Sequence, residues 1–180
     1  YPALQEKIWR SIDRDVYEQA SLDQYRAAAA AYWAKGADAI YLPWFAWPQA
    51  EDDRRVLSEI HDPSRLAHLS KHYVVKRDNE GASQFGYHSE LPFELPTGAD
   101  AKTASLYVAE EPDDVRATLR LLFMYQSAHD SMTVTVNGTS LDNDSAWRTI
   151  RGFTHIYIDY PLPAESLRSG HNEVGVAIHS

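Results

Sequence analysis

The sequence MTVTVNG at residues 132–138 decides the fold class of this chain. Its methionine and two valines alternate with two threonines, which is the period of a β-strand with one buried face. Asn137-Gly138 follows at once, and this dipeptide is the strongest short-range signal for a two-residue hairpin turn. Residues 132–138 therefore predict a half-buried strand that ends in a hairpin.

The same alternation of apolar and other residues recurs on both sides of this strand. Several short alternating strands with turn signals between them are typical of a β-sandwich or a barrel. We therefore predict an antiparallel β-sandwich, jelly-roll-like, over residues 73–180. The further alternating runs are Leu106–Val108, Leu119–Phe123, Ile156–Tyr160 and Val174–Ile178.

The first 72 residues follow a helical period instead. Ser21 is a good N-cap and Gly36 stands where a glycine ends a helix, so we predict a helix between them. The apolar residues 39–42, followed by Pro43, predict a short buried strand of the kind found in parallel sheets. The fold class is then α+β, with a helical segment carrying one short strand (1–72) before the sandwich domain. Further helices are expected over residues 2–19, 51–60 and 62–70.

The composition argues against several classes of function. With 17 Lys and Arg against 26 Asp and Glu, the net charge is -9, which disfavours nucleic acid or an anionic membrane as a partner. The absence of cysteine excludes disulfides, thiol catalysis and cysteine-based zinc sites. We find no G-x-S-x-G, P-loop or G-x-G-x-x-G motif, and no cofactor is predicted. His68 and His72 have the spacing of a helical metal pair but lack the glutamate of H-E-x-x-H, so no metal site is predicted either.

The chain opens at Tyr1-Pro2, with no initiator methionine and no signal-peptide pattern. We expect either that a signal has been removed or that the chain was cut from something longer. No stretch approaches the length of a membrane span, so a soluble protein is expected. Its compartment stays open, with a secreted or periplasmic one favoured.

Several stretches together resemble a known pattern. RAAAAAYWAKGADAIYLPWF (26–45) and LSEIHDPSRLAHLSKHYVV (57–75) are similar to the closing helix–strand–helix steps of bacterial glycoside-hydrolase-like (β/α)8 barrels. MTVTVNG and LRSGHNEVGVAI (167–178) are similar to jelly-roll sandwiches appended to such barrels. Ala39 replaces the usual glycine of the barrel strand, and Pro43-Trp44 stands where those families often carry Phe-Asn-Trp. A barrel needs roughly 200 residues, so the resemblance implies only about its last quarter, in a C-terminal fragment.

The loop after the predicted strand carries the first candidate site. Trp44, Phe45 and Trp47 are crowded between two prolines and could form a rigid platform on which a sugar stacks. In a (β/α) barrel this loop would lie on the face where active sites form. Glu51 and Asp53 are the weak catalytic candidates, because glycoside hydrolysis needs a pair of carboxylates. The alternative is that the rings pack at a domain junction and that the acids stabilise a helix N-terminus.

The second candidate site lies on the sandwich. His155, Tyr157 and Asp159 share one face of a predicted strand. If that face is exposed, Tyr157 and Trp147 are candidates for glycan binding; if the helical segment covers it, they are interface residues. Both alternatives remain open at the level of sequence.

These observations support one leading functional hypothesis and two alternatives. The leading one is the C-terminal region of a glycoside hydrolase, in which the sandwich is an ancillary or carbohydrate-binding module for a poly- or oligosaccharide. The first alternative is a small glycosidase active in its own right. The second is a structural or oligomerisation domain without a ligand, for which a homodimer through the unpartnered strand at 39–42 is one arrangement.

Overall fold

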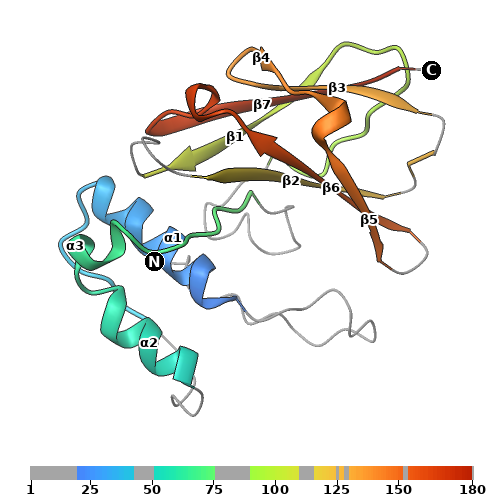
Figure 1. The fold of residues 1–180 in the computed structure, drawn as a ribbon. Helices are drawn as coiled ribbons and strands as arrows, with labels where there is room; N and C mark the ends of the chain where they lie inside the picture. The colour runs from blue at the N-terminus through green and yellow to red at the C-terminus, as the bar shows by residue number, and fades with distance from the viewer. Residues whose placement is uncertain are drawn as a thin grey trace. The chain divides into compact units, whose positions relative to one another are not determined.

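The chain has a mixed α+β fold that divides into two compact units (Figure 1). The computed structural model describes residues 20–42, 51–75, 90–109, 116–124, 126–127, 130–151 and 154–179. The helical unit comprises Tyr1–Val74 with Val108–Glu110, and the sandwich unit comprises Val75–Tyr107 with Glu111–Ser180. A helical segment followed by two antiparallel sheets confirms the predicted fold class. The helix expected over residues 2–19 lies outside the described residues.

The first described helix begins and ends where its sequence predicts. Helix α1 spans Leu22–Ala34, and Ser21 caps it in a reciprocal box with Gln24. The Gln24 backbone N–H donates to the Ser21 hydroxyl at 3.3 Å, and the Ser21 N–H donates to the Gln24 side chain at 2.8 Å. Gly36 has a φ of 83°, the left-handed conformation that glycine adopts readily after a helix.

The helical unit is held by a small apolar core and a buried ion pair. Helices α2 (Glu51–Glu59) and α3 (Pro63–Leu66) are the other helices that the structure describes in this unit. Arg26 is only 5% exposed, and its Nε donates to Glu59 at 2.7 Å, so its charge is neutralised inside the unit. The Trp33 indole N–H donates to the Ile60 carbonyl at 2.8 Å. The core consists of Ala29, Ala30, Val56, Ile60 and Leu66.

The strand predicted at residues 39–42 is wrong. These residues follow α1 without regular structure, and Tyr41 is 75% exposed. A parallel strand needs neighbouring strands to satisfy its backbone, and no described strand pairs with residues 39–42. Ile40 and Leu42 instead pack, partly buried, against the helical core. The homodimer suggested through an unpartnered strand therefore has no strand on which to form.

Two antiparallel sheets form the sandwich unit, and Figure 1 shows them as two layers. One sheet has the strand order β1-β7-β3-β4, and the other has the order β2-β6-β5. Short 3-10 turns at Asn143–Ser145 and Ala164–Ser166 lie where the chain passes from one sheet to the other, between β4 and β5 and between β6 and β7. The strands are β1 (Lys102–Val108), β2 (Ala117–Met124), β3 (Ser131–Val136), β4 (Thr139–Ser140), β5 (Trp147–Arg151), β6 (His155–Leu162) and β7 (Gly170–His179).

Both sheets contribute to one apolar core, as a sandwich requires. Val134 and Val136 of β3 are 0% and 1% exposed, which confirms the alternation that predicted the strand. Ile158 and Tyr160 from the opposite sheet pack into the same cluster. Each fully buried valine contributes roughly 1.5 to 3 kcal/mol relative to an exposed one.

The predicted hairpin turn is present after β3. Asn137 and Gly138 have φ values of 51° and 83°, the two positive angles of a turn that matches strand twist. Val136 pairs with Thr139 across the turn. Among the helices that the structure describes, none has the length and apolar character required to span a bilayer.

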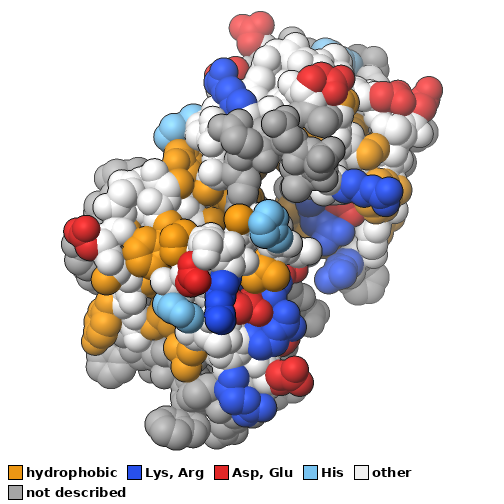
Figure 2. All heavy atoms as spheres, turned by 60° about the vertical axis from the view of Figure 1, so that its left-hand side comes forward, with side chains coloured by type: hydrophobic (Ala, Val, Ile, Leu, Met, Phe, Trp, Pro, Cys, Tyr) orange, Lys and Arg blue, Asp and Glu red, His pale blue; other side chains and the backbone are white. Residues whose placement is uncertain are grey.

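Hydrophobic side chains reach the surface in both units. On the face shown in Figure 2 they lie among Lys, Arg, Asp and Glu side chains. In the helical unit Tyr41, Leu57 and Val74 are exposed, and in the sandwich unit all the exposed large apolar side chains come from β2 and β5. Those of β2 and β5 are Leu122, Met124, Trp147 and Ile150, at 52%, 50%, 49% and 65% exposure.

Candidate functional site

Strand pairing gathers the sandwich candidates onto one side of the three-stranded sheet. Asp159 of β6 is paired with Arg120 of β2 on one side and with Trp147 of β5 on the other. Tyr157 is paired with Leu122 and with Thr149 in the same way. Paired residues project to the same side of a sheet, and the alternate residues of β6 face the core. We call the outward side the outer face; it comprises Arg120, Leu122, Met124, Trp147, Thr149, Arg151, His155, Tyr157 and Asp159.

A buried carboxylate organises the outer face. Asp159 is 1% exposed and accepts two hydrogen bonds from Arg120, from Nε to Oδ1 and from NH2 to Oδ2, both at 2.6 Å. This bidentate geometry is the strongest form of the Arg–carboxylate pair. Arg120 holds the pKa of Asp159 below its usual range against the opposing effect of burial, and a hydrogen bond from the Trp147 side chain lowers that pKa further. The ion pair therefore fixes the Arg120 guanidinium, and Trp147 lies on the other side of the same carboxylate.

Trp147 lies half-exposed next to the buried carboxylate. It is 49% exposed, it is the β5 partner of Asp159, and its side chain contributes to the low pKa of that residue. A cavity of about 220 Å³ also borders Trp147, but Arg148, Ile158 and Tyr160 line it from the core-facing side of the sheet. The cavity is lined by Asp130, Ser131, Met132, Asn143, Ala146, Trp147, Arg148, Ile158 and Tyr160.

Tyr157 has a different environment from Trp147. The Arg120 and Arg151 guanidinium carbons lie 5.8 and 5.4 Å from the centre of its ring, both within cation–π distance. Arg120 is paired with the residue two positions after Tyr157 and Arg151 with the residue two positions before it. The ring is therefore flanked from both ends by cations. Of the two aromatic candidates on this face, Trp147 is the one available for stacking.

The Arg120–Asp159 ion pair predicts how the free energy of unfolding changes at acidic pH. The pKa of Asp159 is lower in the folded chain than its ordinary value, so the pair stabilises the fold above the unfolded pKa of about 3.9. This contribution is lost as the pH falls through the folded pKa. We expect Arg120→Gln to reduce the difference in unfolding free energy between pH 7 and pH 3, measured by urea titration. Lys102→Gln, on the other sheet, is the control; an equal reduction in both variants would contradict the assignment.

The acidic candidates of the helical unit occupy the first turn of α2. Glu51 is exposed and Asp53 is half-buried. Burial raises the pKa of Tyr25, and the charge of Asp53 raises it further. Carboxylates in the first turn stabilise a helix through its dipole, which accounts for both positions. The aromatic candidates Trp44, Phe45 and Trp47 lie outside the described residues.

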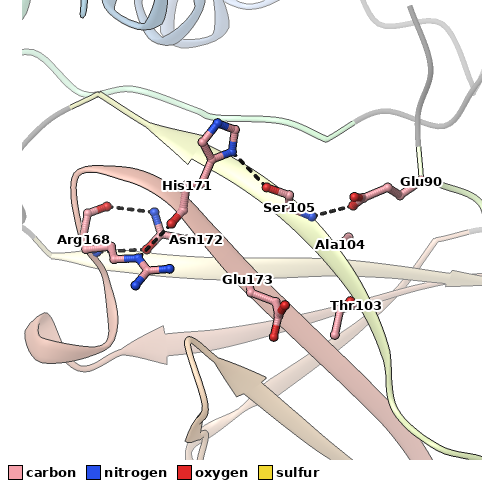
Figure 3. Close-up of a pocket in the computed structure, with 8 residues that line it drawn as sticks. All are labelled: Glu90, Thr103, Ala104, Ser105, Arg168, His171, Asn172 and Glu173. Atoms are coloured by element: carbon pink, nitrogen blue, oxygen red, sulfur yellow. Dashed lines mark hydrogen bonds between the residues drawn. The ribbon is translucent and has the colours of Figure 1, made fainter.

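A second cavity lies on the four-stranded sheet, and no sequence motif predicts it. It has a volume of about 210 Å³ (Figure 3). Ser105 of β1 and His171 of β7 point toward one another, with Oγ and Nδ1 3.0 Å apart. Alternation predicts which residues of each strand face outward. Whether Ser105 meets His171 depends on which strands are neighbours in the sheet. The lining residues are Glu90, Thr103, Ala104, Ser105, Arg168, His171, Asn172 and Glu173.

The residues that line this second cavity do not form a nucleophilic triad. A serine nucleophile needs a histidine base that is oriented by a carboxylate. Here the Glu90 carboxylate accepts the backbone N–H of Ser105 at 2.6 Å. His171 instead packs edge-on against the Tyr107 ring, with centroids 5.2 Å apart. Within the described ranges, no group of three or more His, Asp or Glu side chains could hold a metal ion.

Comparison with known proteins assigns neither a family nor a function to the chain. No family model matches the chain, and no curated protein matches it in sequence.

Proposed function

We propose that the sandwich unit is a carbohydrate-binding module and that its ligand covers Trp147 on the outer face. The observation that carries this proposal is a half-exposed indole on the same face of the sheet as a buried Arg–Asp ion pair. A buried charge costs desolvation energy, and here its two hydrogen bonds position the Arg120 guanidinium, which remains half-exposed on the other side of Asp159 from Trp147. An arrangement of this kind presents an apolar ring and a cation to a ligand on one face.

The chemistry of Trp147 fits a sugar. The C–H face of a pyranose is apolar and flat, so it packs on an indole ring and removes apolar surface from water. Sugar hydroxyl groups at the edge of the ring need polar partners, and Arg120, which lies half-exposed on the same face, supplies N–H donors. Pockets for small ligands commonly combine an apolar wall with a few polar groups in this way.

The sandwich would then serve as the ancillary module of a carbohydrate-active protein. This agrees with the resemblance of the N-terminal segment to the end of a glycoside-hydrolase-like barrel. A glycosidase acting through Glu51 and Asp53 is less favoured, because residues two apart on a helix do not face each other and both lie in the first turn of α2. A structural domain without ligand predicts instead that Trp147 is buried between copies of the chain.

Affinity electrophoresis of the full chain tests the proposal. Gels would contain one polysaccharide each, from a panel of neutral and acidic polymers: xylan, mixed-linkage glucan, mannan, polygalacturonate and alginate. We expect at least one polymer to slow migration relative to a polysaccharide-free gel. The proposal fails if a folded chain is slowed by none of them. Sedimentation velocity adds a second criterion, since a stable dimer without retardation would favour the structural alternative.

A further inference from the structure

The outer face is a regular grid, because the register of the three strands sets which side chains lie beside one another. Rows of paired residues cross the sheet from β2 through the central strand β6 to β5. Neighbouring strands are about 4.8 Å apart, and successive rows on one face are about 7 Å apart. The rows are Arg120-Asp159-Trp147, Leu122-Tyr157-Thr149 and Met124-His155-Arg151.

The two diagonals of this grid differ in chemical character. Trp147, Tyr157 and Met124 lie on one diagonal, which runs from a corner of β5 to the opposite corner of β2. We call it the apolar diagonal. Arg120 and Arg151 occupy the other two corners, and their guanidinium carbons lie 5.8 and 5.4 Å from the centre of the Tyr157 ring. The apolar diagonal is therefore crossed at its centre by a cationic one.

Exposed apolar surface lies at both ends of the apolar diagonal. Trp147 is 49% exposed and Met124 is 50% exposed, and they belong to the two edge strands of the sheet. Leu122, which is 52% exposed, lies two residues before Met124 on the same face of β2. Exposed apolar groups gathered on one face mark binding surfaces. A ligand that covered Trp147 alone would leave Met124 and Leu122 in water.

The apolar diagonal is longer than one sugar ring. Trp147 and Met124 are separated by two strand spacings and by four residues along the strands, which corresponds to about 17 Å between their backbones. A single pyranose covers only part of this distance, whereas a chain of several linked rings reaches both ends. Such a chain packs apolar ring faces on Trp147 and on Met124 and leaves its hydroxyl groups at the sides of the diagonal.

We infer that the ligand is an internal stretch of a polysaccharide that lies along the apolar diagonal, with Met124 as a second contact position far from Trp147. This inference rests on the proposed function and specifies its ligand as a chain of sugars instead of a terminal one. Each ring that covers further apolar surface adds to the affinity. Affinity should therefore rise with chain length until the ligand reaches Met124, whereas a site for a terminal sugar would show no such rise.

The test is a chain-length series bound to the full chain. The probes are oligosaccharides of two to six sugars from xylan, mixed-linkage glucan, mannan, polygalacturonate and alginate, and isothermal titration gives each dissociation constant. Within the series that binds, we expect the affinity to increase at least about tenfold from the disaccharide to the hexasaccharide.

Met124→Ala tests the far end of the path. It should weaken binding of the hexasaccharide about fivefold and leave binding of the disaccharide unchanged. Met124→Leu keeps an apolar side chain of similar volume and should retain most of the affinity. Ile150→Ala is the matched control, because Ile150 is 65% exposed on β5 but pairs with Ile156, which faces the core. It should weaken neither ligand, and urea unfolding verifies that each variant is folded.

The outcomes separate this inference from the proposed function. Equal affinity for the disaccharide and the hexasaccharide overturns the inference and leaves a carbohydrate-binding module. A rise with chain length that Met124→Ala does not reduce also overturns it, because the ligand then follows another path from Trp147. The same holds if Ile150→Ala weakens the hexasaccharide as much as Met124→Ala does. If no oligosaccharide or polysaccharide is bound at all, the proposed function itself fails.

Discussion

Trp147→Ala should remove most of the retardation of the chain in a polysaccharide gel, with affinity reduced about 30-fold or more. A tryptophan at the centre of a binding surface commonly contributes 2 kcal/mol or more, which corresponds to this factor. The expectation is specific to Trp147 because it is 49% exposed on the outer face, whereas Tyr157 on that face is flanked by two guanidinium groups. Isothermal titration with an oligosaccharide of the retarding polymer measures the change directly.

Trp147→Phe is the matched variant for this experiment. It keeps a flat but smaller aromatic face and loses the indole N–H, so it should retain part of the affinity. Urea unfolding of both variants controls for loss of fold, which we expect to be small because half of the side chain is already in water. Unchanged affinity in a folded Trp147→Ala chain would place the ligand elsewhere.

Asn172→Ala should lower the free energy of unfolding by about 3 kcal/mol, the largest loss of stability we expect from a polar residue. Asn172 is 1% exposed, and its side chain makes four hydrogen bonds. Its Oδ1 accepts from the Asn137 side chain at 2.8 Å and from the Arg168 backbone N–H at 2.9 Å. Its Nδ2 donates to the carbonyls of Arg168 and Gly170. Truncation leaves several of these groups without a partner inside the protein.

Asn172→Asp distinguishes the two halves of this network. The aspartate keeps both acceptor positions and loses both donors, so it faces the carbonyls of Arg168 and Gly170 with negative charge. We therefore expect Asn172→Asp to be destabilised at pH 7 and to recover part of the loss at pH 3, where the carboxyl is protonated. Urea titrations followed by circular dichroism measure both variants. A loss below about 1 kcal/mol for Asn172→Ala would show that water replaces the side chain without cost.

The architecture of the sandwich could be predicted from local pattern. In a strand, successive side chains point to opposite faces, so Val134 and Val136 must lie on one side wherever the strand is placed. Asn137-Gly138 likewise predicts the turn, because both positions have positive φ angles that few other residues tolerate. Helix α1 was predictable for the same reason, because Ser21, Gln24 and Gly36 act within a few residues of one another.

The strand predicted at residues 39–42 shows where local pattern is insufficient. A short apolar run indicates burial, and burial in a sheet cannot be distinguished from burial against helices by sequence alone. The resemblance to a barrel favoured the sheet, but a strand needs neighbours to satisfy its backbone groups. Ile40 and Leu42 are partly buried against the helical core instead.

The sequence by itself determined that strands such as 132–136 and 156–160 alternate as in a sandwich and that Tyr157 and Asp159 share a face. It did so because side-chain direction depends only on position within a strand. Only the tertiary structure decided that Arg120 meets Asp159, 39 residues away, and that Trp147 lies half-exposed on the other side of the same carboxylate. Register and strand order bring these three residues together, and both follow from packing of the whole sheet and not from any segment of it.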